Sequence, residues 1–127
     1  MKYLFTFICA MFSFLNICEA NIVPIVKIDC LQYNLDLEHY EKLNEQDYYM
    51  YIETYNVNTK DICVLHIMTN REENSYTVTN SIVRTHNGFM KSYSENEKGT
   101  YSEISIIGKA IELLDKHEEE LKEESKV

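Results

Sequence analysis

The chain contains 127 residues, carries a formal net charge of −9 at pH 7, and has ten tyrosines but no tryptophan. This length predicts a single domain. The acidic balance argues against nucleic acid or an anionic membrane as a partner, because both attract clustered Lys and Arg. With only three glycines and no Gly-x-Ser-x-Gly turn, the sequence indicates neither a phosphate loop nor a serine nucleophile.

The first twenty residues have the charge, length and cleavage chemistry of a secretory signal peptide. Lys2 precedes an apolar run from Tyr3 to Ile17, and small residues follow at the cleavage site that ends with Ala20. A membrane helix is the weaker alternative, because the run is shorter than the roughly twenty residues that a bilayer demands. We therefore expect a secreted, extracellular protein in which residues 21–127 form one domain.

Two cysteines, Cys30 and Cys63, lie outside the expected signal peptide. An exported chain with two cysteines most economically pairs them. In the chain-entropy model, closing that loop would stabilise the fold by roughly 3–4 kcal/mol. Two buried free thiols are the alternative. We predict a Cys30–Cys63 disulfide.

The chain ahead of the main sheet is expected to contain an extended arm and a short helix. Asn21 to Tyr33 is extended by composition, and Pro24 suits an edge strand or a leading arm better than a central strand. Asp36 to Glu45 predicts the helix, because Asp36 is a good cap and apolar residues follow at spacings of three.

Four runs of strand-forming residues, separated by polar turns, predict an antiparallel meander. Their tyrosine, threonine and β-branched residues suit a pleated, half-buried surface. Asn87-Gly88 is the sharpest turn signal, since both residues tolerate the positive φ of a two-residue hairpin. The four runs are Tyr48–Asn56, Ile62–Thr69, Tyr76–Arg84 and Phe89–Tyr93.

A charged loop from Ser94 to Gly99, a few residues of strand at Tyr101–Ile104 and a helix from about Ser105 to Lys122 are expected next. Gly108 weakens that helix by about 1 kcal/mol relative to Ala. The helix and tail are acidic from Glu112 onwards. The predicted fold class is α+β and mostly β, with a short helix before the meander and a C-terminal helix. The apolar stripe of that last helix is Ile107, Ile111, Leu114 and Leu121.

Tyr48 to Tyr55 reads Tyr-Tyr-Met-Tyr-Ile-Glu-Thr-Tyr, and Cys63-Val64 follows after a short loop. This is similar to the tick histamine-binding lipocalins, whose first strand begins with Tyr-Tyr-Met-x-x-x-Thr-Tyr and whose second begins with Cys-Val. The interval from Cys30 to Cys63 also resembles the spacing in insect lipocalins. The usual Gly-x-Trp is absent, and there is room for four or five strands instead of eight. The chain thus resembles a truncated arthropod lipocalin, of the kind found in saliva or venom.

The resemblance implies that Tyr55 faces a ligand cavity, and strand alternation puts Tyr49, Tyr51 and Glu53 on the same face. An acid among aromatic rings suits a cationic amine. The alternative is that these tyrosines are ordinary amphipathic core residues. The implied function is a secreted, non-enzymatic binding protein for a small amine or an apolar ligand.

Geometry restricts this interpretation, because about eight strands are needed to enclose one small ligand. With fewer strands, a site would be an open groove or a sheet–helix cleft. An open edge also invites pairing with another chain, so a homodimer is possible. The alternative function is a secreted effector or inhibitor that acts on a host protein without a small-molecule cavity. A non-functional splice form of a longer lipocalin is a third possibility.

The histidines do not form short-range pairs with other potential ligands, so we predict no metal and no cofactor. Paired acids such as Glu72-Glu73 lie in a predicted turn and are more simply explained by solvation. No residues support catalysis, and the protein is not expected to be an enzyme. The four histidines are His39, His66, His86 and His117.

Overall fold

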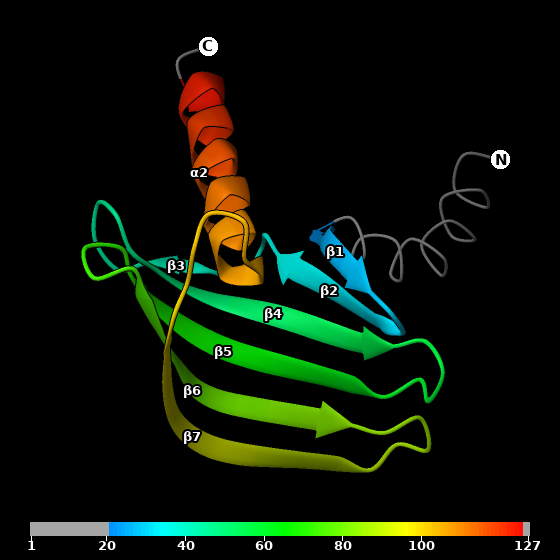
Figure 1. Cartoon of the computed structure of the whole chain (residues 1–127). Helices are drawn as coiled ribbons and strands as arrows, with labels where there is room; N and C mark the ends of the chain where they lie inside the picture. The colour runs from blue at the N-terminus through cyan, green and yellow to red at the C-terminus, as the bar shows by residue number, and fades with distance from the viewer. Residues whose placement is uncertain (1–20, 126–127) are drawn as a thin grey trace, which may run out of the picture.

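The computed structural model describes residues 21–125, so the expected signal peptide lies outside the described part. The described residues form seven β-strands and one helix (Figure 1). The strands are β1 (Ile22–Ile28), β2 (Leu31–Asp36), β3 (Glu41–Lys42), β4 (Tyr48–Asn56), β5 (Ile62–Asn70), β6 (Ser75–Arg84) and β7 (Met90–Thr100), and the helix is α2 (Ile106–Ser125).

All seven strands belong to one antiparallel sheet with the order β1-β2-β4-β5-β6-β7. The short β3 pairs with the first residues of β4, whereas β2 pairs with its second half. The sheet is open, with β1 and β7 as its two edges. The predicted mostly-β meander followed by a helix is therefore confirmed, although the described chain has more strands than expected.

The helix predicted for Asp36 to Glu45 is wrong. Asp36 is the last residue of β2, and its Oδ1 accepts hydrogen bonds from the backbone N–H groups of Glu38 and His39 at 2.8 and 3.1 Å. An aspartate that caps a helix can equally close a turn, because both structures offer the same pair of backbone donors. Here the turn leads into β3 instead of a helical turn.

The loop predicted for Ser94 to Gly99 is also wrong, because β7 continues to Thr100 and pairs with β6 on both sides of a register shift at Glu95 and Asn96. Tyr101 to Ile104, predicted as strand, forms the turn that precedes α2. Gly99 lies opposite Tyr76, and a Cβ atom at Gly99 would lie only 2.6 Å from the tyrosine ring. The glycine thus lets an aromatic ring lie across the strand, which fixes the register.

Irregular pairing around Thr79 curls the sheet. Ile67 pairs with Val78 while His66 pairs with Asn80, so β6 has one unmatched residue against β5. The pairing of β7 with β6 shifts at the same place. Bulges of this kind bend a strand and increase its twist. As a result, β7 and β2 line a common cavity although three strands lie between them in the sheet.

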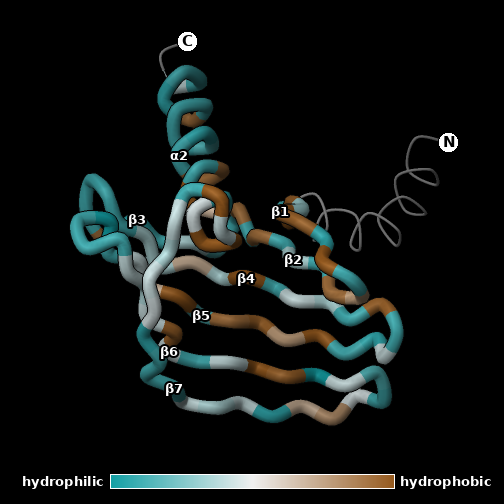
Figure 2. The backbone as a smooth tube through the Cα atoms, viewed as in Figure 1, coloured by the Kyte–Doolittle hydropathy of each residue, from teal (hydrophilic) through white to brown (hydrophobic). Residues whose placement is uncertain are grey.

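The core lies between one face of the sheet and the first half of α2. Tyr48, Met50 and Ile52 alternate along β4 and are at most 2% exposed, whereas the intervening residues are half-buried on the opposite face. Figure 2 shows hydrophobic residues along the central strands and at the start of α2, while the rest of the helix is mostly hydrophilic. The buried residues of α2 are Ile107, Gly108, Ala110, Ile111 and Leu114.

Ser105 starts the helix as its N-cap. Its Oγ accepts a hydrogen bond from the N–H of Gly108 at 3.2 Å, and its carbonyl accepts one from Lys109 at 2.9 Å. The predicted helix from Ser105 to Lys122 is thus confirmed, with its end three residues later. Gly108 is needed for packing, because a Cβ atom there would lie 2.0 Å from the carbonyl oxygen of Ser102.

Two acids on α2 fasten the helix to the sheet. Asp115 accepts a hydrogen bond from the Tyr48 hydroxyl at 2.6 Å and forms a salt bridge with Arg71 at 3.0 Å. Glu118, almost one turn later, accepts a hydrogen bond from the Tyr40 hydroxyl at 2.7 Å. Beyond Glu118 the helix is exposed and extends away from the sheet (Figure 1).

The predicted disulfide is not formed in this structure, where Cys30 and Cys63 are free thiols. The carbonyl of Cys30 accepts a hydrogen bond from Val57, just beyond β4, whereas Cys63 pairs with Thr54 from the other side of β4. The two cysteines therefore lie on opposite sides of β4. Because neighbouring strands are about 4.8 Å apart, two such spacings separate the cysteines by roughly 10 Å or more. A disulfide requires Cα atoms within about 7 Å.

Replacing Gly108 by Ala tests the close approach at the start of α2. Alanine favours an exposed helix by about 1 kcal/mol, but here its methyl group would force the turn at Ser102 away. We expect a net loss of about 2 kcal/mol in the free energy of unfolding, measured by urea denaturation. Lys116→Ala, at an exposed position of the same helix, is the control and should change stability by less than about 0.5 kcal/mol. A more stable Gly108→Ala variant would contradict the packing.

Alkaline pH should weaken the attachment of α2. Burial, followed by the hydrogen bonds to Glu118 and Asp115, raises the pKa of Tyr40 and Tyr48 above the ordinary value of 10.0. Above pH 10 the unfolded chain therefore binds fewer protons than the folded one, and the free energy of unfolding falls as pH rises. Urea midpoints between pH 8 and 11 should show a flatter decline in the Tyr40→Phe/Tyr48→Phe variant. Because all other titrating groups remain, an unchanged slope would contradict this role.

Candidate functional site

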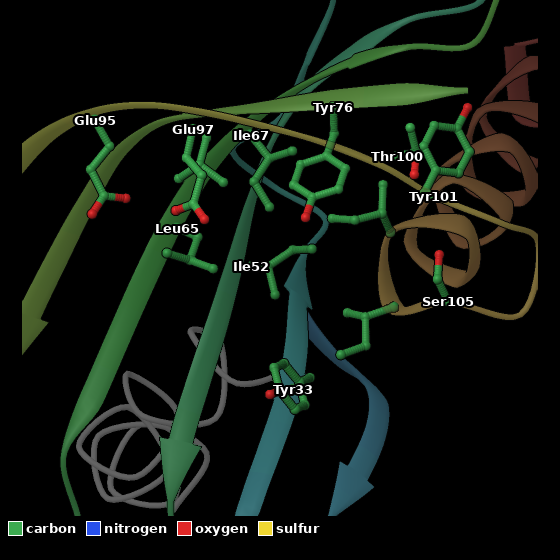
Figure 3. Close-up of a pocket in the computed structure, with 13 residues that line it drawn as sticks. Tyr33, Ile52, Leu65, Ile67, Tyr76, Glu95, Glu97, Thr100, Tyr101 and Ser105 are labelled. Atoms are coloured by element: carbon green, nitrogen blue, oxygen red, sulfur yellow. The ribbon is translucent and has the colours of Figure 1, made fainter. Parts of the chain in front are cut away.

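A cavity of about 370 Å³ lies between the sheet and the first turn of α2 (Figure 3). Its walls come from β2, β4, β5, β6 and β7, from the turn before α2, and from the start of the helix. The curl of the sheet and the short turn that starts with Tyr101 bring these elements together. The cavity is the sheet–helix cleft expected for a sheet that does not close.

The interior of the cavity is apolar. Ile52 and Ile67, which are about 1% exposed, lie on neighbouring strands, and Val78 lies beside them on β6. Ile107 of α2 lines the cavity from the opposite side, and Tyr33 of β2 contributes a ring. Such a surface favours the apolar part of a ligand, because each Å² removed from water contributes about 25 cal/mol.

One wall of the cavity carries two carboxylates. Glu95 and Glu97 lie on β7, and Figure 3 shows their carboxylates and the hydroxyl of Tyr76 directed toward the same space. Among the described residues, neither carboxylate has a hydrogen bond or a salt bridge. The nearby Lys91 lies over the ring of Tyr93, with 5.1 Å between Nζ and the ring centroid. The site thus combines an apolar interior with two unpaired acids.

Tyr101 stands between this cavity and a second, more polar one of about 480 Å³ that is lined by Arg71, Glu103 and Asp115 among others. Its hydroxyl is buried and has no hydrogen-bond partner within residues 21–125. Burial raises the pKa of this phenol, and the Arg71 charge opposes that shift. A neutral hydroxyl is therefore available to a bound molecule that offers a donor or an acceptor.

The four residues predicted to bind ligand do share one face of β4, but it is the face turned away from α2. Tyr49, Tyr51, Glu53 and Tyr55 alternate with the buried core residues, and none of them lines the sheet–helix cavity. Glu53 accepts a hydrogen bond from the side-chain amide of Asn34 at 3.2 Å. On this face the acid is therefore already partnered.

An aromatic cluster occupies part of that opposite face. The ring of Tyr51 lies 4.4 Å from that of His66 and 5.7 Å from that of Tyr49, measured between centroids. The hydroxyls of Tyr49 and Thr79 are 3.1 Å apart and share a hydrogen bond. Burial lowers the pKa of His66, which favours the neutral imidazole at pH 7. In this cluster Tyr49 and Tyr51 pack against each other and against His66, on the face of β4 opposite the core.

Sequence reasoning missed the acids of the cavity because it assigned Ser94–Gly99 to a loop. The available signal was an alternation of period two, since Glu95 and Glu97 are two residues apart and line the same cavity. Tyr76 and Tyr101 were not selected either, because nothing local in the sequence places them beside a helix that starts later in the chain.

No family model, no curated protein and no solved structure matches this chain. In the part of the chain that the structure describes, no helix is long and apolar enough to cross a membrane. Within the same residues, no group of three or more His, Cys, Asp or Glu side chains is arranged to hold a metal ion. The class that fold and site define is an open antiparallel sheet with one helix and a cavity between them.

Two tyrosine-to-phenylalanine variants should change stability in opposite directions. Tyr101→Phe removes a buried hydroxyl without a partner and should raise the free energy of unfolding by about 1 kcal/mol. Tyr48→Phe removes a hydroxyl bonded to Asp115 and should lower it by about 2 kcal/mol. Urea denaturation at pH 7 measures both. Equal losses in the two variants would mean that the Tyr101 hydroxyl is partnered in solution.

Proposed function

We propose that the protein is a non-enzymatic binding protein that holds a small amine or an apolar ligand in the sheet–helix cavity. The observation that carries this proposal is the pairing of an apolar interior with two unpaired carboxylates on one wall. The volume lies within the roughly 300–1,000 Å³ typical of small-molecule sites. A few polar groups in an otherwise apolar cavity are the usual means of fixing a ligand's orientation.

The acids favour an amine over other polar ligands. An ammonium group donates charge-assisted hydrogen bonds to carboxylates, and these are roughly twice as strong as neutral ones. Glu95 is the better placed of the two, because it is half-buried whereas Glu97 is exposed. The hydroxyl of Tyr76 supplies a further donor or acceptor, and the interior beyond it accepts the hydrocarbon part of the ligand.

We further propose that the chain is a shortened, secreted relative of the lipocalins. The antiparallel meander from β4 to β7 and the C-terminal helix support this proposal. In a closed lipocalin barrel, the interior formed by about eight strands holds the ligand. Here the sheet is open, and in this proposal the space between the sheet and α2 takes the place of the barrel interior.

Calorimetric titration with histamine, serotonin and a fatty acid tests the proposed function. We expect binding of the amines, and Glu95→Gln should weaken it about tenfold or more, because a charge-assisted hydrogen bond contributes about 1.5–3 kcal/mol. Glu53→Gln is the matched control: it makes the same chemical change on the opposite face and should leave amine binding unchanged.

Each other outcome has a definite meaning. A loss confined to Glu53→Gln would move the site to the tyrosine face. Binding of the fatty acid alone, unaffected by Glu95→Gln, would retain a small-ligand binder and remove the role of the acid. A folded protein that binds none of the three would favour a secreted effector or inhibitor that acts through protein contacts.

A further inference from the structure

The last strand of the sheet is a long edge that no other described strand covers. β7 pairs only with β6 and lies at the edge of the sheet (Figure 1). It spans eleven residues, and nearly all of them are exposed. Met90 is 63% exposed and Tyr93 is 41% exposed, and Phe89, just before the strand, is 62% exposed. A long edge strand with exposed apolar residues is a template for pairing with another chain.

The opposite edge of the sheet is guarded. β1 is shorter, contains Pro24, and shifts register between Pro24 and Val26. A proline and a bulge are two of the devices that prevent edge-to-edge pairing. β7 contains no proline, but its pairing with β6 shifts between Ser94 and Glu97, so that irregularity and its charged side chains are the devices it has. Whether those charges repel or attract a partner depends on the register.

We propose that the protein forms a homodimer in which the β7 strands of two copies pair antiparallel about a two-fold axis at Ser94. In this register Lys91 of each copy faces Glu97 of the other, and Tyr93 faces Glu95. Opposite charges directly across an antiparallel pair are stabilising, and like charges are destabilising. The pairing spans Met90 to Lys98 and joins the two sheets into one.

Neighbouring registers are less favourable. With the axis at Glu95, the two Glu95 side chains would face each other, and Tyr93 would face Glu97. With the axis at Tyr93, Lys91 would face Glu95, but the paired region would shorten to Met90–Asn96. The Ser94 register opposes each Lys91 with an acid, avoids facing like charges and includes two more residues of β7 than the Tyr93 register.

The second copy would also change the charge at the ligand site. Glu97 lines the cavity, so the Lys91 that faces it in the dimer brings a positive charge to the rim of that cavity. Glu95 faces a tyrosine in the same register and stays available to an amine. The dimer itself rests on the β7 edge alone and does not depend on the proposed ligand.

Sedimentation velocity over a wide concentration range tests the dimer and its register. The unaltered protein should dimerise, and Lys91→Glu or Glu97→Lys should each raise the dimer Kd about tenfold or more, because each creates two like-charge contacts. The charge-swapped double variant should restore the dimer. Lys98→Glu is the matched control: it changes the same charge on the same strand, but it faces Met90 and should leave the Kd nearly unchanged.

A cross-linking experiment gives a second readout. In a Cys30→Ser/Cys63→Ser background, Ser94→Cys should form an intermolecular disulfide with oxidised glutathione, because the two Ser94 residues face each other across the axis. Ser92→Cys should not, because its two copies would be about 13 Å apart along the strands. A protein that stays monomeric, a dimer insensitive to both charge reversals, or equal cross-linking at Ser92 would overturn the proposal.

Discussion

A single helix must cover one face of a sheet that is much wider than the helix. A helix is about 10 Å across with its side chains, whereas six laterally ordered strands span about 24 Å. α2 therefore buries its apolar residues against β4 and its neighbours, where Met50, Ile52 and Leu114 are at most 1% exposed. Everything that remains uncovered on this face follows from that mismatch, including the cavity and the exposed β7.

The position of α2 is set by a close approach at one point and polar contacts at another. Because Gly108 has no side chain, the first turn of the helix can lie against the Ser102 carbonyl. Two turns later, Asp115 accepts hydrogen bonds from the Tyr48 hydroxyl and from Arg71. These contacts hold the helix at the Tyr48 end of β4, and a space of about 370 Å³ remains between the helix and β7. The curl at Thr79 then turns β7 toward that space, so that an edge strand becomes a cavity wall.

Sequence patterns predicted the strands whose alternation is strong and local. β4 was predicted with the bounds that it has, because its tyrosines and β-branched residues favour a pleated surface. The segment after Asp36 was misassigned because one capping residue serves both a helix and a turn. The strand predicted for Phe89–Tyr93 was too short, because the charged residues from Ser94 to Gly99 suggest a loop. In the structure, pairing with β6 overrides that preference. The cavity was missed as a consequence, since its acids lie on the omitted half of β7.

The proposed ligand site and the proposed dimer both involve the pair of acids on β7. Both carboxylates line the cavity, but in the Ser94 register only Glu97 acquires a counter-charge, from Lys91 of the second copy. A ligand's ammonium group that relied on Glu97 would then compete with the dimer, because one carboxylate cannot satisfy two cations equally well. One that relied on Glu95 would not compete. By linkage, an amine that binds through Glu95 alone leaves the dimer Kd unchanged, and one that recruits Glu97 raises it.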